Sequence, residues 1–313
     1  MRAGRVLRAL ALLVAALFVF LTAAGVAMFR RDLPVGELAG AYAGPASRYA
    51  AIEGMQVHYR DEGTGPPLVL LHGTFSSLHT WDGWVAHLAA SRRLIRLDLP
   101  GFGLTGPAPD RDYRAERLAR VVAALMDRLE IQSADLAGNS LGGRVALTLA
   151  LAHPDRVRKL IVLDASGLSG AAPPPIVRLA RMPVANRLLR HLTPRFLVRR
   201  NLEEVYGDPS QVTDDLIDRY QAMQRRAGNR QALLDRLNGP ADPPLDSRIA
   251  ELRMPVLVMW GEADRWAPLT HARRFQREIA GAELKIYPGV GHVPMEERPD
   301  QTAADADAFL ARD

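Results

Sequence analysis

Four short apolar runs follow one another in the chain, and each is separated from the next by a segment long enough for a helix. They read PLVLLHG, RLIRLDLPG, SADLAGNS and KLIVLDASG. One intervening segment, residues 113–130, carries leucine, valine and methionine at helical spacing. Strands that alternate with helices pair in parallel, because each helix carries the chain back across a face of the sheet. The chain is therefore predicted to form an α/β fold with a mostly parallel central sheet flanked by helices.

Two parts of the chain depart from this alternation. The stretch AIEGMQVHYRDEG alternates apolar and polar residues around Glu53 and Gly54, which predicts an antiparallel hairpin. Between residues 166 and 250 no strand pattern is found, and PPPIVRLARMPVANRLLRHL and DDLIDRYQAMQRRAGNRQALLDRL read as helices. Because strands resume with PVLVMWGEAD and ELKIYPGVGH, we interpret the interruption as a helical cap inserted over one end of the sheet.

The N-terminal segment has a different character. Residues 9–29 are 21 residues without a charge, which as a helix would reach about 31 Å and cross a bilayer core. They predict a membrane anchor; a cleaved signal peptide is the alternative, although its apolar region is usually only about 7 to 15 residues long. Three arginines before the segment and two after it favour a cytoplasmic N-terminus, with the catalytic part outside the inner membrane on the periplasmic side. The predicted parts are an anchor or signal segment (1–31), a tether (32–48), the first part of the core (49–165), the cap (166–250) and the second part of the core (251–313).

The charge distribution argues against nucleic-acid binding. The formal net charge of +5 comes from five arginines in the first 31 residues, and the remaining 35 basic and 35 acidic residues cancel. A nucleic-acid-binding protein is expected to carry its positive excess on the folded domain. The chain also contains no cysteine, which excludes disulfides, a thiolate nucleophile and cysteine-ligated metals.

The third apolar run ends in LAGNSLGG, where Ser140 lies between Gly138 and Gly142 at G-x-S-x-G spacing. In a parallel sheet, reactive groups collect at the carboxyl ends of the strands. Such a strand-to-helix turn is too tight for side chains at the two glycine positions, and it presents the serine hydroxyl at the positive end of the next helix. The same motif also occurs in ordinary turns, so the serine is a candidate nucleophile only if suitable partners are present.

A serine nucleophile needs a base, and the base needs an acid that orients it. Asp264 in WGEAD follows a predicted strand, and His292 in GVGHVP follows the next one. The chain order Ser140, Asp264, His292 is that of the α/β-hydrolase triad. Asp164 in LIVLDAS is the alternative acid, because it too follows a buried strand; otherwise it is a hinge or a helix N-cap.

Acyl transfer also requires donors for the oxyanion. The backbone N–H of Leu141 is one expected donor, and the HGTFSS loop supplies the N–H of Thr74 as the second, with Phe75 as the fallback. His72 and Asp98 also end strands, and we expect them to brace their loops rather than to take part in the chemistry.

Taken together, LLHGTFSS, DLPGFG, GNSLGGR, WGEAD and GHVPMEERP resemble the α/β-hydrolase superfamily. The resemblance is to capped members related to serine esterases, cofactor-free haloperoxidases, epoxide hydrolases and meta-cleavage-product hydrolases, and it extends from about residue 50 to the C-terminus, weakly in the cap. By the family pattern, Ser140, Asp264 and His292 match the catalytic positions, and Thr74 and Leu141 match the oxyanion positions. Epoxide hydrolases and haloalkane dehalogenases carry an aspartate in place of Ser140, which argues against those two activities.

The resemblance implies hydrolysis of carboxylic esters of small or medium apolar acids through an acyl-enzyme, with no metal and no organic cofactor. The expected partners are a small-molecule ester and the membrane that the N-terminal segment enters, and not nucleic acid; the oligomeric state is left open. The cap would supply an apolar pocket, for which four residues are candidates: Leu188, Leu192, Phe196 and Leu197. The arginines between them are interpreted as a solvated helix face, with contact to anionic lipid headgroups as the alternative.

Two alternatives to ester hydrolysis remain. A carbon-carbon bond hydrolase or a lactonase could use the same triad, but meta-cleavage-product hydrolases typically place a tryptophan directly after the catalytic histidine, where this chain has Val293. Trp266, two residues after the acid, is not assumed to replace it. A non-catalytic, ligand-binding receptor on the same fold is the other alternative.

Overall fold

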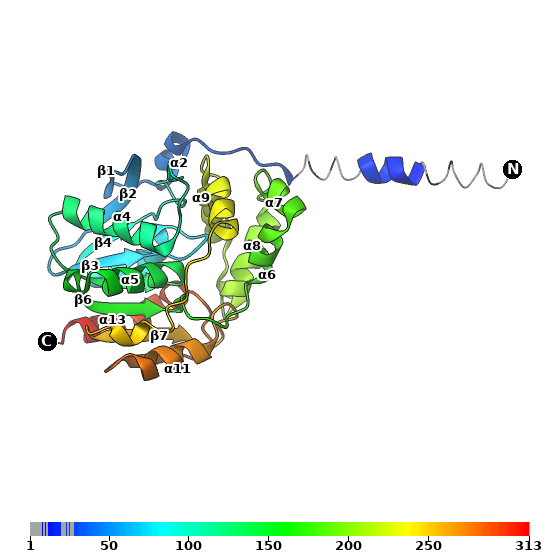
Figure 1. The fold of residues 1–313 in the computed structure, drawn as a ribbon. Helices are drawn as coiled ribbons and strands as arrows, with labels where there is room; N and C mark the ends of the chain where they lie inside the picture. The colour runs from blue at the N-terminus through cyan, green and yellow to red at the C-terminus, as the bar shows by residue number, and fades with distance from the viewer. Residues whose placement is uncertain are drawn as a thin grey trace.

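The computed structural model describes residues 8, 10, 12–19, 23, 25 and 28–312. Within them, eight strands form one sheet in the order β1-β2-β4-β3-β5-β6-β7-β8 (Figure 1). The pairs β1/β2 and β2/β4 are antiparallel, and all other neighbours are parallel, which confirms the predicted mostly parallel sheet. The strands are β1 (Ser47–Ile52), β2 (Met55–Glu62), β3 (Pro67–Leu71), β4 (Arg93–Leu97), β5 (Ala134–Asn139), β6 (Val157–Leu163), β7 (Val256–Gly261) and β8 (Glu283–Tyr287).

The predicted hairpin is formed by β1 and β2, and Glu53 and Gly54 make its turn. Both residues have positive φ angles, 47° and 80°. Such a pair is typical of the two-residue turns whose twist matches that of antiparallel strands. The hairpin prediction is therefore confirmed.

Helices cover both faces of the sheet. Successive residues of a strand point to opposite faces, so an apolar strand contributes side chains to a buried cluster on each face. In β3, Val69 and Leu71 belong to one buried cluster, and Leu68 and Leu70 belong to the other. The first cluster packs against α4 (Ala115–Arg128), α5 (Leu141–Ala152) and α11 (Leu269–Glu278), and the second packs against α3 (Asp82–Leu88) and α13 (Pro299–Leu310). The helix predicted over residues 113–130 corresponds to α4.

The chain between β6 and β7 contains helices and no strand, and its helices lie together beyond one end of the sheet (Figure 1). Several of these helices begin at or directly after a proline, whose fixed φ suits the first helical turn. We call residues 166–250 the cap. Its helices are α6 (Pro175–Arg181), α7 (Pro183–Leu189), α8 (Arg195–Val205), α9 (Asp214–Gln224) and α10 (Asn229–Asn238), with short 3-10 turns at Pro209–Gln211 and Ile249–Glu251.

Residues 32–48, predicted as a tether, contain the helix α2 (Val35–Tyr42). Leu33 and Leu38 are buried in a small cluster with Leu104 and Met223. This segment is therefore packed against both the core and the cap, because its few apolar residues find a complementary apolar surface there.

The predicted membrane span, residues 9–29, falls partly on residues outside the described part of the chain. The described residues from 12 to 19 are helical, and this piece lies away from the body of the molecule (Figure 1). Among the described residues, no helix has the length and apolar character needed to cross a bilayer. The anchor and the signal peptide both stay predictions.

Candidate active site

Ser140 directly follows β5 and directly precedes α5, and its backbone is strained, with φ 53° and ψ −112°. A Cβ atom at Gly138 would overlap the carbonyl group of Gly142, and one at Gly142 would overlap the carbonyl oxygen of Leu71. Both glycines are thus required by the close approach of the backbone. The N–H of Ser140 donates to the carbonyl oxygen of Leu163, which ties the turn to the end of β6.

Asp264 and His292 come together at the ends of β7 and β8. The ring nitrogen Nδ1 of His292 lies 2.7 Å from Oδ2 of Asp264, and Oδ1 of Asp264 accepts hydrogen bonds from the N–H groups of Trp266 and Ala267. Burial alone would raise the pKa of Asp264, but the charge and hydrogen bond of His292 and these two N–H groups outweigh it and lower the pKa. Asp264 is therefore an ionised carboxylate that holds Nδ1 and leaves Nε2 of His292 free to act as a base.

Ser140 and His292 line the same cavity, between the carboxyl edge of the sheet and the cap. No hydrogen bond joins their side chains in this structure, and such bonds often form only when substrate is bound. The cavity also contains Thr74, Phe75 and Trp266, and the ring of Trp266 lies 5.4 Å from that of His292. The structure thus gathers the predicted base, nucleophile and oxyanion loop in one place.

Three backbone N–H groups are available near the nucleophile. Leu141 is the first residue of α5, and Thr74 and Phe75 lie in the loop after β3, where the N–H of Ser76 bonds to the carbonyl of Gly73. None of the N–H groups of Leu141, Thr74 and Phe75 donates to another described residue. They are free to serve as oxyanion donors.

His72 braces the loop that it begins, as expected. Its Nδ1 donates to the carbonyl of Gly73, and its Nε2 accepts from the N–H of Leu99. Complete burial lowers the pKa of His72, which keeps the ring neutral and suits this pair of bonds.

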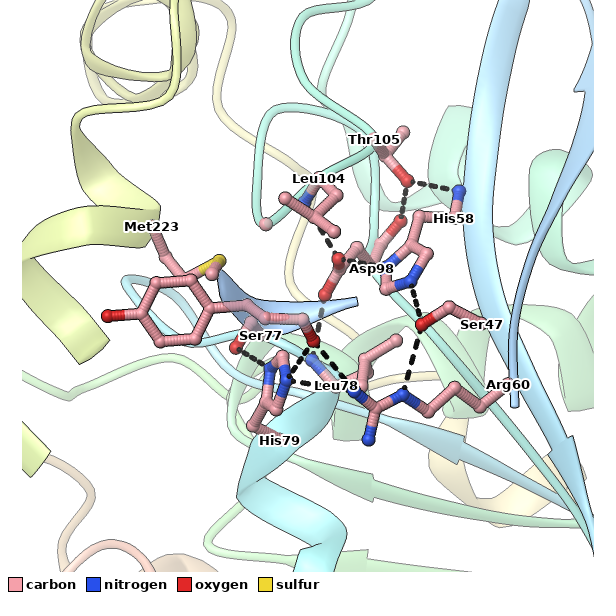
Figure 2. A network of polar contacts seen from close by, with 12 residues as sticks. Ser47, His58, Arg60, Ser77, Leu78, His79, Asp98, Leu104, Thr105 and Met223 are labelled. Carbon is pink, nitrogen blue, oxygen red and sulfur yellow. Dashed lines mark hydrogen bonds and ion pairs between the residues drawn. The ribbon is translucent and has the colours of Figure 1, made fainter. Parts of the chain in front are cut away.

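Asp98 ties the oxyanion loop to the turn after β4 (Figure 2). Its Oδ1 accepts from the N–H of Leu78, and its Oδ2 accepts from the N–H of Leu104 and from Nδ1 of His58 at 2.7 Å. Burial by itself would raise the pKa of Asp98, but the hydrogen bond and charge of His58 outweigh it and hold the pKa well below its usual range. Asp98 therefore has a structural role, because both its carboxylate oxygens are bonded to groups of β2 and of the segments after β3 and β4.

Two residues that support His292 were missed from the sequence. Nδ2 of Asn139 donates to the carbonyl of His292, and Glu297 accepts hydrogen bonds from the N–H groups of Gly291 and Gly207. Both residues lie in motifs that the sequence analysis quoted, GNSLGGR and GHVPMEERP. Their roles depend on contacts between distant segments, which local patterns do not reveal.

One group of residues in the described part of the chain has the spacing of a metal site. Ligand atoms of Asp164, Asp264 and His292 lie within 4.8 Å of one another. Nδ1 of His292, however, is already bonded to Asp264. The arrangement fits a histidine-carboxylate pair better than a metal centre.

The sequence model of a family described as the alpha/beta hydrolase fold matches residues 66–299. The chain belongs to the α/β-hydrolase superfamily. It is 31% identical over 271 residues, 82% of this chain and 91% of the relative, to 2-hydroxymuconate semialdehyde hydrolase of Pseudomonas sp. (strain CF600). These findings identify the protein as a hydrolase.

Two solved structures extend the comparison with other α/β-hydrolases. A meta-cleavage product hydrolase from Pseudomonas fluorescens IP01 is 25% identical, with a TM-score of 0.75 over 84% of this chain and 97% of that one. A membrane phospholipase A, described as a bacterial virulence factor, is 25% identical, with a TM-score of 0.72 over 96% of this chain and 97% of that one.

Replacing Asp98 with asparagine should lower the free energy of unfolding by about 3 kcal/mol, because one amide oxygen cannot satisfy three buried donors. Urea denaturation of Asp98→Asn measures the change. Asp300→Asn is the matched control, since the Asp300 side chain is 86% exposed; its effect should stay within about 0.5 kcal/mol.

Wild type and Asp98→Asn also provide a test of pH dependence. Because folding lowers the pKa of Asp98 from its ordinary 3.8, its stabilisation is present above pH 3.8 and is lost as the pH falls toward the lower, folded value. The difference between wild type and Asp98→Asn should be constant near neutral pH and narrow below pH 3.8. Equal losses in Asp98→Asn and Asp300→Asn would contradict the bracing role.

Proposed function

We propose that the protein is a serine hydrolase that cleaves carboxylic esters of small or medium apolar acids through an acyl-enzyme. The observation that carries the proposal is the cavity shared by Ser140 and His292, with Asp264 bonded to the far nitrogen of the imidazole. Nε2 of His292 accepts the proton of Ser140, whose oxygen attacks the acyl carbon. The ionised Asp264 stabilises the imidazolium that forms.

The remaining steps use groups at the same edge of the sheet. The oxyanion of the tetrahedral intermediate accepts hydrogen bonds from the N–H of Leu141 and from Thr74 or Phe75. His292 then protonates the leaving alcohol and later activates the water that releases the acid. No step requires a metal or an organic cofactor.

An apolar cavity inside the cap supports an apolar acid. Leu192 and Leu197 line it, together with Leu189 and Leu233, and Phe75 lines both this cavity and the catalytic one. An acyl group bound at Ser140 can therefore extend past Phe75 into the cap. Leu188 and Phe196, two of the four residues expected to line the pocket, are instead 53% and 59% exposed. In short helices, the face that turns inward is set by tertiary packing rather than by apolar character alone.

Cleavage of a carbon-carbon bond is the second candidate function. Several relatives, 2-hydroxymuconate semialdehyde hydrolase among them, carry names that support carbon-carbon cleavage more directly than ester hydrolysis. Two observations also favour it: the ring of Trp266 packs against His292, and Arg181 lines the catalytic cavity without an acidic partner among the described residues. Nε of Arg181 donates to the carbonyl of Leu237, and the remaining N–H groups of the guanidinium are suited to the carboxylate of a dienoate.

Ester hydrolysis is favoured by the character of the cap cavity. Its lining is mostly apolar, and its one arginine, Arg230, is paired with Asp32 at 2.6 Å. The membrane phospholipase A, whose name denotes an ester hydrolase, aligns with 96% of this chain, whereas the meta-cleavage product hydrolase aligns with 84% of it.

The proposed location is the inner membrane, with the catalytic part on the periplasmic side. Phe29 stacks on His191 and forms a β-bridge with Leu192, so the N-terminal segment leaves the body of the molecule beside α7 (Figure 1). Apolar side chains are exposed on both sides of this junction, which suits an environment of lipid. They include Leu12, Leu13, Phe18 and Val19 in the N-terminal segment and Met182, Val184, Leu188 and Phe196 in the cap.

Ser140→Ala should keep the fold and reduce ester turnover by a factor on the order of 10⁴, because the members of a triad act as a unit. Chromogenic ester hydrolysis and circular dichroism measure the two properties. Ser91→Ala is the control, since the hydroxyl of Ser91 bonds to the carbonyl of Leu88 and Ser91 does not line the cavity. Residual activity above about a tenth of wild type in Ser140→Ala would remove Ser140 as the nucleophile.

Short and medium aliphatic esters should be hydrolysed with kcat/KM about a hundredfold higher than a ring-fission dienoate, a difference of about 3 kcal/mol in transition-state binding. Steady-state kinetics on both substrates give the ratio. Arg181→Gln separates the candidates further: it should leave ester turnover unchanged, but would lower dienoate turnover if Arg181 bound its carboxylate. Comparable rates on the two substrates would favour the carbon-carbon hydrolase, and absence of both activities would favour the receptor.

The full chain should fractionate with membranes and resist extraction by high salt, because apolar insertion is not screened by ions. A chain that begins at Leu33 should remain in the aqueous fraction. Mass spectrometry of the mature protein distinguishes the alternatives, since an N-terminus between residues 24 and 30 would identify a cleaved signal peptide.

A further inference from the structure

Asp164 is a buried acid that the proposed mechanism does not use. It follows β6 with a positive φ of 46°, and its side chain is completely buried. Oδ1 accepts a hydrogen bond from the N–H of Gly261 at 2.9 Å. Oδ2 is buried and has no partner among the described residues. Because buried polar atoms are nearly always hydrogen-bonded, this oxygen either carries a proton that it donates or accepts a hydrogen bond from a donor.

The neighbours of Asp164 supply no second donor. A carboxyl oxygen of Asp164, one of Asp264 and a ring nitrogen of His292 all lie within 4.8 Å of one another. The other titratable groups that bear on it are Glu297 of α12 (Pro294–Glu297) and Tyr287 at the end of β8, and neither is a cation. The carboxylate of Asp264 is therefore an acceptor close to a proton on Asp164.

The hydrogen bonds decide which of the two aspartates carries a proton. Two carboxyl groups this close in a buried site cannot both be ionised. Asp264 accepts three hydrogen bonds, from Trp266, Ala267 and His292, whereas Asp164 accepts only one. Burial first, and then the negative charge of Asp264, raise the pKa of Asp164 well above its ordinary value. Both differences favour the negative charge on Asp264 and the proton on Asp164.

We propose that Asp164 is a positioning residue of the candidate active site: its protonated carboxyl group donates a hydrogen bond to the carboxylate of Asp264. When position 264 carries a neutral side chain, Asp164 becomes the anion that supports His292. The inference rests on the proposed serine hydrolase chemistry. It assigns distinct states to two aspartates that follow neighbouring strands, one a fixed anion and the other a neutral donor.

The matched substitutions at position 164 are asparagine and leucine. Asn keeps an N–H donor toward Asp264 and a carbonyl oxygen for the N–H of Gly261, so Asp164→Asn should stay within about threefold of wild type. Asp164→Leu has as many side-chain heavy atoms but a larger volume, and it offers neither a donor to Asp264 nor an acceptor to the N–H of Gly261. Its activity should fall by about tenfold or more, at least the size of one charge-assisted hydrogen bond. Equal activities in the two variants would overturn the positioning role.

The second test compares Asp264→Asn with the double variant Asp164→Asn/Asp264→Asn between pH 5 and 10. Without the charge of Asp264, Asp164 should ionise at a lower pH and stabilise the imidazolium. The activity ratio of the single to the double variant should be near one at low pH and rise to about tenfold at high pH. At each pH the two variants differ only at position 164, so the ratio reports the state of Asp164 and its effect on His292. A ratio of one throughout would overturn the proposal, as would a loss in Asp164→Asn as large as that in Asp264→Asn, which would make Asp164 the triad acid.

The readout should be the rate at which a fluorophosphonate labels Ser140, measured beside ester turnover. Labelling reports the activation of Ser140 by His292 and does not depend on the physiological substrate. If labelling follows the pattern above while no ester is hydrolysed, the ester assignment fails and the role of Asp164 stands. If esters are hydrolysed but labelling does not respond to substitution at position 164, the role of Asp164 fails and the ester assignment stands.

Discussion

The close contact between two backbone turns, one after β3 and one after β5, is the constraint on which the candidate site depends. A Cβ atom at Gly73 would lie 2.8 Å from Oδ1 of Asn139, and one at Gly142 would overlap the carbonyl oxygen of Leu71. Gly142 cannot carry a side chain, so its turn meets the end of β3 backbone to backbone, while Gly73 leaves room for the side chain of Asn139. This contact brings the loop of Thr74 and Phe75 into the cavity of Ser140, so the proposed nucleophile and its proposed oxyanion donors are positioned by one packing contact.

A second backbone contact joins the base to the cap. The N–H of His292 donates to the carbonyl of Val205 at the end of α8, and a Cβ atom at Gly291 would overlap the same carbonyl oxygen. Glu297 bonds to the N–H groups of Gly207 and Gly291, one on each side of this crossing. The cap is therefore part of the support of His292, and a movement of α8 would displace the base as well as the substrate cavity.

Much of this arrangement could be predicted from local sequence patterns, because a strand end followed by a glycine-rich turn is a local feature. The parallel sheet, the hairpin at Glu53-Gly54 and the positions of the three candidate catalytic side chains at strand ends all follow from such patterns. The helix α2 could not be predicted, since its burial depends on Leu104 and Met223 far along the chain. The same limit applies to Asn139, whose partner is the carbonyl of a residue 153 positions away.

The two aspartates show most clearly what the local pattern leaves undecided. Asp164 and Asp264 each follow a buried strand, so position alone cannot tell a fixed anion from a neutral donor. The difference arises from the backbone: the turn after Asp264 directs two N–H groups at its carboxylate, whereas Asp164 receives one from Gly261. In the proposed arrangement Asp164 is protonated and Asp264 is the anion paired with His292. In the proposed mechanism this charge balances the positive charge that the imidazole acquires when it takes the proton of Ser140, and the N–H groups of Leu141 and of the loop after β3 stabilise the oxyanion.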